Sequence, residues 1–334
     1  MRIGLFVDLR NPPEWRRPWP ALYGRTLERI EEAERLGLDS VWLSEHHLFE
    51  DGYLPQPLTF AAAVAARTRR LRIGTAILQA PLRPAIDVAE QAAIVDLLSE
   101  GRLELGLGAG YRIPEWQAWG TDGAGRYERL EACAREVRRL WETGAATPPP
   151  AQARVPIWIG GEGPRGARMA GRLGEGLLVL DASLLEVYRD ALAAAGHAPA
   201  CARVSGCANL LLASDPERAW HAVLPHLAYQ WQSYERYAVQ GTGRAPQDID
   251  AARLRTSGPP VLPRFDVVTV EQAVARLRSW LDGLPVAHVY LWSTIAGMPD
   301  ALADEHLVLL ARLRAALCDD PEPREDSDGA AGLS

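Results

Sequence analysis

Short apolar segments alternate with amphipathic segments along almost the whole chain. The apolar segments do not alternate strictly between apolar and polar positions, which is typical of parallel strands covered on the outside by helices. We therefore expect strands at eight places, which are 2–8, 38–43, 72–78, 102–107, 155–159, 176–180, 203–212 and 287–292.

The segments between these strands carry apolar residues at helical spacing. Apolar residues fall on one face in 21–37 and again in 126–142. Thr269 followed by Gln272 predicts a capping box at the start of a later helix. The last helix is expected at about 300–318.

Eight strands, each followed by a helix, predict an α/β fold of the (β/α)₈ TIM-barrel class. We expect one barrel over 1–318, because no shift in composition marks a second domain. The stretches 44–57 and 230–268 are longer than a barrel requires. Long loops of this kind tend to form lids or binding loops, so we expect them as insertions at the C-terminal face.

Composition narrows the possible chemistry. The chain has 334 residues, of which 48% are hydrophobic and 24% charged, and this is ordinary for a globular protein. All 36 basic residues are arginines. Schiff-base enzymes, pyridoxal-phosphate enzymes and Walker-type nucleotide-binding proteins all need a lysine amine, so these classes are excluded.

Charge is concentrated near the end of the sequence. The net charge is −7, and residues 319–334 contribute about −5 of it through six acidic residues and one arginine. We expect this polar, acidic tail to be disordered. The rest of the chain has no basic stripe, so nucleic acid is not an expected partner.

Cysteine spacing and hydropathy indicate the compartment. The four cysteines show no close CxxC pair, so free thiols in a reducing compartment are expected. The N-terminal apolar stretch is too short for a signal peptide, and no apolar run is long enough for a membrane helix. We therefore expect a cytoplasmic protein with no membrane partner.

The run Glu45-His46-His47 directly follows the second predicted strand, where barrel enzymes place active-site residues. Adjacent side chains on an extended segment point to opposite sides, so only one of the two histidines can face a given centre. No acidic cluster at the other predicted strand ends completes a metal site. A histidine that handles protons or orients a substrate is favoured over a metal ligand or a purely structural loop histidine.

Three further segments at predicted strand ends are rich in small residues. Residues 74–79 could let a flat ligand approach the backbone, although they could equally be a plain strand. Residues 106–110 (GLGAG) lack the GxGxxG spacing of a dinucleotide site, which leaves a cofactor-binding strand end or a plain turn. Residues 160–165 (GGEGPR) precede a predicted helix and could bind an anion, or form only a tight turn.

Taken in order, several segments resemble the luciferase-like, flavin-dependent monooxygenases. The segments are 41–47 (VWLSEHH), 74–76 (GTA), 96–102 (DLLSEGR), 106–110 (GLGAG), 119–122 (WGTD) and 126–131 (RYERLE). The resemblance runs from Arg2 to about Trp141 and becomes thinner beyond that point. It implies a barrel that binds FMN at its C-terminal face, commonly as a dimer. A separate reductase supplies reduced FMN, and O₂ is used to oxidise a small organic substrate.

The resemblance also implies roles for individual residues. His46 matches the active-site histidine of the family. Ala76 and Ile77 match a non-prolyl cis peptide that supports the flavin ring. Gly108 and Tyr111 fall where the ring edge and the phosphate pass. The residues that match phosphate contacts are Arg126, Gly161, Glu162 and Gly163.

Some positions depart from luciferase itself. Ala109 stands where luciferase has a phosphate-binding arginine, so phosphate binding would depend on Arg126, backbone amides, and Arg112 or Arg165. Gly108 stands where luciferase has a cysteine next to the flavin. The C-terminal half diverges, so oxidation of an aldehyde with light emission does not follow.

Two other functions remain open within the same superfamily. One is hydride transfer that depends on the deazaflavin F420, and the other is a non-catalytic flavin-binding protein. The Glu-His-His run favours FMN, and the presence of His46 favours an enzyme. The missing lysine suggests a GC-rich genome, in which such enzymes often act in secondary metabolism.

Overall fold

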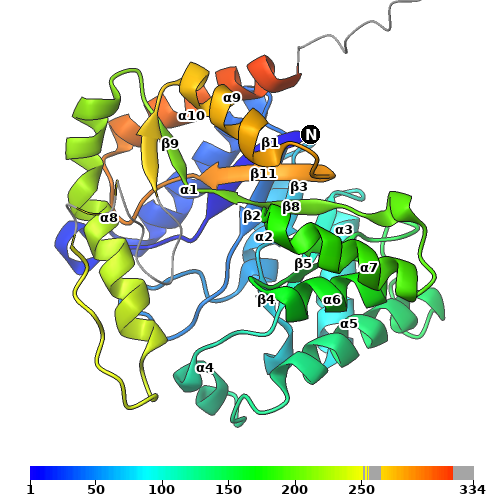
Figure 1. Cartoon of the computed structure of the whole chain (residues 1–334). Helices are drawn as coiled ribbons and strands as arrows, with labels where there is room; N and C mark the ends of the chain where they lie inside the picture. The colour runs from blue at the N-terminus through cyan, green and yellow to red at the C-terminus, as the bar shows by residue number, and fades with distance from the viewer. Residues whose placement is uncertain (251–252, 254, 256–264, 319–334) are drawn as a thin grey trace, which may run out of the picture.

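The computed structural model describes residues 1–250, 253, 255 and 265–318 (Figure 1). Eight parallel strands form a closed ring in which β1 pairs with both β2 and β11, and β3 pairs with β5. This confirms the expected (β/α)₈ barrel. The ring consists of β1 (Arg2–Val7), β2 (Ser40–Leu43), β3 (Arg72–Thr75), β5 (Leu103–Gly108), β6 (Ile157–Gly160), β7 (Gly176–Leu178), β8 (Val204–Ala208) and β11 (Val286–Trp292).

Ten α-helices in the described residues surround the ring (Figure 1). They are α1 (Trp19–Arg35), α2 (Pro57–Arg67), α3 (Ala85–Leu98), α4 (Ile113–Ala118), α5 (Arg126–Glu142), α6 (Pro164–Leu173), α7 (Leu185–Ala194), α8 (Pro216–Ala238), α9 (Val270–Leu281) and α10 (Asp300–Cys318). Short 3₁₀ helices lie at Pro13–Trp15, Ala80–Leu82, Ala182–Leu184 and Pro199–Cys201. The predicted capping box of Thr269 and Gln272 starts α9.

Three short strands lie outside the ring. β4 (Leu78–Gln79) continues along β5, while β9 (Leu210–Leu212) pairs in parallel with β10 (Asp266–Val268). The expected single strand at 203–212 is therefore wrong, because the structure divides it at Asn209 into a ring strand and a strand of this second sheet.

The two long stretches differ from each other. Residues between β2 and α2 are irregular, as predicted for 44–57. The stretch 230–268 is only partly a loop, because α8 continues to Ala238 and β10 ends the stretch. Gln230, Ser233 and Tyr237 are buried at helical spacing on this last part of α8, which explains why it stays helical.

The inside of the barrel is filled in layers. On β1 the side chains of Ile3, Leu5 and Val7 pack under the helices, while Phe6 joins a second cluster inside the ring. That cluster forms an aromatic layer, in which the ring of Trp42 lies 5.0 Å from that of Tyr290 and 6.0 Å from that of Trp158. The barrel is thus a packed core, and ligands can enter only at its ends.

A polar layer lies below the aromatic layer, towards the N-terminal ends of the strands. Glu104 is buried there and accepts a hydrogen bond of 2.8 Å from the indole nitrogen of Trp158. It also forms an ion pair with Arg72, and His288 Nε2 lies 3.6 Å from Glu104 Oε1.

Three further expectations concern the cysteines, membrane helices and the tail. None of the four cysteines forms a disulfide, as expected. Within the described part of the chain, no helix has the length and apolar character to cross a membrane. The predicted acidic tail, 319–334, lies outside the described residues, and the single-domain assignment of 1–318 remains a prediction.

Candidate active site

The two histidines of the loop after β2 lie in different surroundings, as expected for adjacent side chains on an extended segment. His47 is buried, and its Nε2 lies 2.6 Å from Glu45 Oε1. Glu45 also accepts hydrogen bonds from the backbone of Gln79 and from Arg83, at 2.6 and 2.7 Å. Glu45 and His47 therefore hold the loop in place, whereas the side chain of His46 remains 12% exposed.

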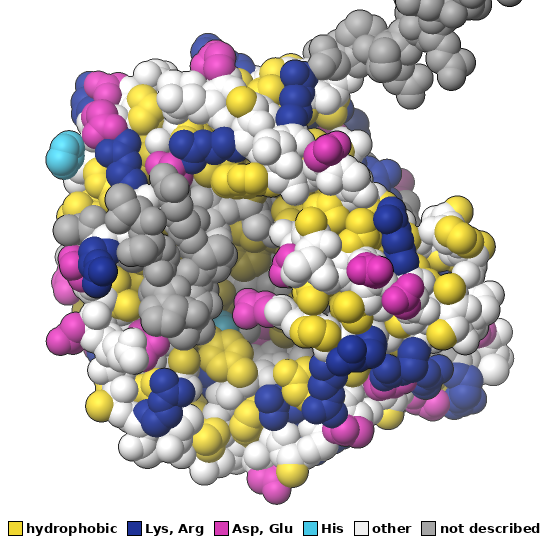
Figure 2. Space-filling model, viewed as in Figure 1, with side chains coloured by type: hydrophobic (Ala, Val, Ile, Leu, Met, Phe, Trp, Pro, Cys, Tyr) yellow, Lys and Arg dark blue, Asp and Glu magenta, His cyan; other side chains and the backbone are white. Residues whose placement is uncertain are grey.

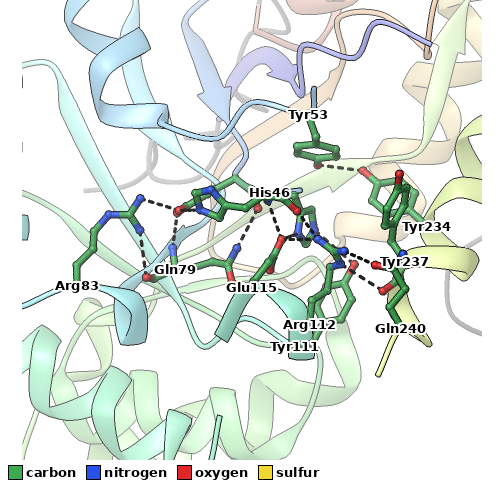
Figure 3. A network of polar contacts seen from close by, with 12 residues as sticks. His46, Tyr53, Gln79, Arg83, Tyr111, Arg112, Glu115, Tyr234, Tyr237 and Gln240 are labelled. Atoms are coloured by element: carbon green, nitrogen blue, oxygen red, sulfur yellow. Dashed lines mark hydrogen bonds and ion pairs between the residues drawn. The ribbon is translucent and has the colours of Figure 1, made fainter. Parts of the chain in front are cut away.

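Glu115 on α4 fixes the orientation of His46 (Figure 3). Its Oε1 lies 2.9 Å from His46 Nδ1, and it also accepts from the backbone N–H of His47 at 2.7 Å and from Arg112 at 2.9 Å. Burial alone would raise the pKa of Glu115. The hydrogen bond and charge of His46, the backbone hydrogen bond from His47 and the charge of Arg112 outweigh burial and lower this pKa to about 2. The carboxylate is thus ionised at neutral pH and can only accept, so His46 donates from Nδ1.

This arrangement leaves the other ring nitrogen of His46 available. Nε2 lies 3.4 Å from the hydroxyl oxygen of Tyr111. A neutral imidazole that donates from Nδ1 carries a lone pair on Nε2, so it can accept a proton there while Glu115 stabilises the resulting cation. The geometry suits a group that takes up and returns a proton.

Arg112 and Glu115 were missing from the predicted catalytic contacts. Arg112 is fully buried, and its guanidinium donates to the backbone oxygens of His47 and Tyr237 and to the side chain of Gln240. It therefore supports the histidine loop and is not placed to bind a phosphate. The available signal was an Arg and a Glu three positions apart shortly after the fourth barrel strand, at the start of a six-residue helix.

Aromatic side chains surround His46. Its ring centroid lies 4.8 to 6.4 Å from those of Tyr53, Phe49, Tyr111 and Tyr234. Tyr111 is 44% exposed, and yet burial raises the pKa of its phenol. Figure 2 shows one face of the molecule hollowed near its centre.

The aromatic residues near these loops divide into two groups. Tyr234 contacts His46, and Trp119 packs on His47. The others are buried in the core around the loop and the barrel: Trp116, Trp231, Tyr237 and Trp292.

Ala76 and Ile77 lie at the end of β3 and are both partly exposed. The peptide bond between them is cis, as the resemblance implied. A Cβ added to Gly108 would lie 2.5 Å from Ile77 Cγ1, and one added to Gly160 would lie 2.5 Å from Ile77 Cγ2. The two glycines thus make room for the Ile77 side chain, so Gly108 shapes this surface through Ile77.

Positive charge gathers where α5 and α6 begin. The guanidinium carbons of Arg126 and Arg165 lie 4.7 and 4.2 Å from the ring centre of Tyr127. Arg165 pairs with Glu128 at 2.5 Å, whereas Arg126 forms no ion pair within the described part of the chain. The Nε atoms of Arg126 and Arg129 are buried without a hydrogen-bond partner among the described residues. Unpaired donors of this kind suit an anion such as a phosphate.

The turn 161–163 leads directly into α6, whose first residue is Pro164. Gly163 caps this helix without a side-chain hydrogen bond. Pro164 has no N–H and Gly166 donates to the Gly163 oxygen, so donors for an anion come from the amide of Arg165 and from the turn itself. Burial raises the pKa of the Glu162 carboxyl group. Its charge also contributes to the raised pKa of Tyr111, so this turn and the surroundings of His46 border one region.

Comparison with known proteins adds three findings. The sequence model described as luciferase-like monooxygenase matches residues 1–274. An F420-dependent glucose-6-phosphate dehydrogenase of Amycolatopsis mediterranei is 34% identical over 187 residues, or 50% of this chain and 56% of that protein. The oxygenase component of a flavin-dependent trigonelline monooxygenase of Acinetobacter baylyi is 28% identical over 186 residues, or 51% of each chain. The chain thus spans about half the length of these curated relatives.

The fold is also found among solved structures. Monooxygenase RslO1 from Streptomyces bottropensis superimposes with a TM-score of 0.77, at 23% sequence identity, over 93% of this chain and 98% of that one. At this level of identity the likeness concerns the fold alone.

Proposed function

The chain belongs to the luciferase-like monooxygenase family, and from this premise we propose that it is a two-component, FMN-dependent monooxygenase. In this proposal a separate reductase supplies reduced FMN, and O₂ is used to oxidise a small organic substrate. The observation that carries the proposal is the pair His46 and Glu115 at the mouth of the barrel, because it holds a proton-accepting nitrogen in an enclosed, largely aromatic space.

The residues at the mouth fit a flavin mononucleotide. Ala76 and Ile77, shaped by Gly108, offer an apolar surface for the ring, and Tyr111 would border it. Arg126, with its unpaired Nε, and the backbone amides at 161–163 would hold the phosphate. Ala109 is 7% exposed and carries no charge, so the phosphate contact of luciferase at this position would pass to Arg126 and Arg129.

Bound reduced FMN would supply the electrons that activate O₂. His46 would accept a proton at Nε2 and later return it, while Glu115 stabilises its cationic form. The surrounding aromatic rings would keep water away, which protects the activated oxygen from unproductive discharge.

A second candidate function is hydride transfer with F420. It is favoured by the identity to F420-dependent dehydrogenases, which is the higher of the two curated matches described above. Calorimetric titration of the purified protein with FMN and with F420, each in oxidised and reduced form under nitrogen, separates the two. We expect tight binding of reduced FMN, followed by substrate oxidation when O₂ is admitted. Binding of F420 alone would favour the second candidate, and binding of neither would refute both.

The role of His46 is tested by His46→Ala. Loss of a general acid–base group typically lowers turnover about 10²- to 10⁴-fold, and we expect this loss while the affinity for reduced FMN is kept. His221→Ala, at an exposed position on α8, serves as the matched control and should behave like the wild type. Undiminished product formation by His46→Ala would remove His46 from the mechanism, and bound flavin with no oxidation of any substrate would favour a non-catalytic protein.

A further inference from the structure

A second ionisable group lies at the mouth of the barrel, next to the surroundings of His46. We propose that Asp8, directly after β1, is a further acid–base group of this site and exchanges a proton with the bound substrate. In the forward step the O–H bond at Oδ2 breaks as an O–H bond forms on a substrate oxygen, and the carboxylate that remains faces Arg10. The inference rests on the proposed function and adds a residue to it.

The alternation of side chains along β1 directs Asp8 to the inside. Ile3, Leu5 and Val7 pack outward under the helices, whereas Phe6 packs inward. Asp8 is two residues beyond Phe6, so its side chain lies above the aromatic layer, at the C-terminal end of the barrel where active sites form. The backbone oxygen of Asp8 accepts a hydrogen bond of 2.9 Å from Leu54, which fixes it to the loop after β2.

Asp8 is 1% exposed, and its Oδ2 has no hydrogen-bond partner among the described residues. Buried carboxyl oxygens are normally paired, so an unpaired one calls for an explanation. Arg10 and Asp51 contact each other at 2.7 Å, and each of them also has one buried atom without a described partner. Three unsatisfied polar atoms in one cluster indicate a place built to contact a polar ligand.

Charged and titratable groups from several elements face Asp8. They are Arg10 on its own segment, Asp51 and Tyr53 from the loop after β2, Tyr234 from α8 and Cys207 from β8. Burial, together with the charge of Asp51, raises the pKa of Asp8 to about 7, although Arg10 opposes this.

The thiol and the two phenols do not compete for this proton. Burial raises the pKa of Cys207, Tyr53 and Tyr234, so these three stay protonated. Arg10 is fixed beside them, since it contacts Asp51 and Ser233 and its guanidinium lies 5.0 Å from the ring centre of Tyr234.

Tyr53 and Tyr234 link the surroundings of Asp8 to those of His46. The ring of Tyr53 lies 4.8 Å from that of His46, and its hydroxyl lies 3.0 Å from that of Tyr234 (Figure 3). Both tyrosines are also near enough to Asp8 for its charge to raise their pKa. Cys207 points into the barrel next to Asp8 and is partly exposed, so accessible space reaches this side of the mouth.

The experiment combines a measurement on the flavin-free protein with turnover. Infrared difference spectra of the full chain are recorded between about pH 5 and 9, for the wild type, for Asp8→Asn and for Asp190→Asn as an exposed control. We expect a protonated-carboxyl band that disappears with a midpoint near pH 7 in the wild type and in the control, and that is missing in Asp8→Asn. With reduced FMN and substrate, Asp8→Asn should bind flavin normally but turn over about 100-fold more slowly.

The outcomes separate the two proposals. A wild-type spectrum without such a band, or full turnover by Asp8→Asn, would overturn the role of Asp8 while His46 stays in place. A wild type that binds no flavin would overturn the proposed function and the catalytic role of Asp8 with it, whatever the band shows. Asp8→Glu keeps a carboxyl group and should recover part of the turnover, so the test does not depend on Asp8→Asn alone.

Discussion

Glu115 illustrates how one buried carboxylate can determine what a histidine does. It is a positioning residue, because it acts on the reaction only through His46. Its lowered pKa, about 2, means that it stays ionised across the whole range in which enzymes of this kind are assayed. The stability that it contributes is therefore complete above about pH 4.5 and is lost only as the pH falls towards 2.

Replacing Glu115 with glutamine removes the charge but keeps the size of the side chain. We expect turnover to fall about 100-fold, because the cationic form of His46 loses its partner. The acid limb of the pH–rate profile should move to lower pH, which a purely structural role would not produce. Steady-state kinetics from about pH 5 to 9 would measure both effects. Glu186→Gln on the exposed face of α7 is the control, and an unshifted profile in Glu115→Gln would contradict this role.

Asp8 has the opposite effect on stability. Its pKa is raised from 3.8 to about 7, so between these values the folded chain binds a proton that the unfolded chain releases. The wild type should therefore lose stability as the pH rises through this window. Asp8→Asn lacks this group. Within this window, its free energy of unfolding minus that of the wild type should therefore increase by about 1.4 kcal/mol per pH unit. Urea unfolding at pH 5, 6, 7 and 8 would measure it, and a constant difference would contradict the raised pKa.

Residues differed in how far the sequence could identify them. His46 was predictable because a histidine directly after a barrel strand has few other places to point. Glu115 lies 69 positions away from it, and Asp8 looks like any acidic residue after an apolar strand. Their partners depend on how loops from β1, β2 and β5 meet, and that is decided by tertiary packing.

At the scale of elements, the starts of α5 and α6 form one surface. Arg126 comes from the first and the turn 161–163 from the second, and Tyr127 lies between Arg126 and Arg165. The resemblance to the family implied that both segments contact a phosphate, and in the structure both helices follow neighbouring strands of the ring, β5 and β6.

Arg126→Ala tests the surface as a phosphate site. Loss of a charge-assisted hydrogen bond costs about 1.5 to 3 kcal/mol, so the Kd for reduced FMN should rise roughly 10- to 100-fold. The Kd for reduced riboflavin, which lacks the phosphate, should not change. Calorimetry on both ligands gives the comparison, with Arg168→Ala on the exposed face of α6 as control. Equal weakening for both ligands would mean that Arg126 does not contact the phosphate.

The sequence pattern does not predict the second, two-stranded sheet of β9 and β10. The run 203–212 carries Arg203, Ser205 and Asn209 among apolar and small residues, so its pattern does not single out Asn209 as a break. In the structure Asn209 accepts a hydrogen bond from the Trp292 indole at 2.9 Å, which holds it at the point where the two sheets separate. β10 is too short to be recognised within a stretch dominated by turn residues.

The whole molecule divides its buried charges between the two ends of the barrel. The cluster around Glu104 lies at the N-terminal end, and the clusters around Glu115 and Asp8 lie at the mouth. In barrels of this kind the mouth carries the chemistry, and the opposite end contributes to stability. Burial would raise the pKa of Glu104, but His288 and Arg72 outweigh it and lower this pKa.

Glu104→Gln should therefore affect folding but not binding. Removing one partner of a buried ion pair typically costs about 3 to 5 kcal/mol, because the other charge is left unpaired. We expect a loss of this order in the free energy of unfolding, with the Kd for reduced FMN unchanged. Chemical denaturation measures the stability of Glu104→Gln and Glu115→Gln, and calorimetry measures their flavin affinity. Together they test whether the N-terminal end contributes to stability and the mouth to function. A weaker flavin affinity in Glu104→Gln would argue against it.

The aromatic layer inside the barrel gives the molecule an optical property. Trp42 on β2 precedes Ser44 by two residues, so its indole lies roughly 7 Å below the level of Ser44 at the mouth of the barrel. Trp158 packs against it. Indoles emit light at wavelengths that flavins absorb. A flavin bound at the mouth would therefore accept this excitation by energy transfer. The tryptophan fluorescence of the protein would fall as flavin binds. The same side chains that close the barrel would report, without any label, on what lies above them.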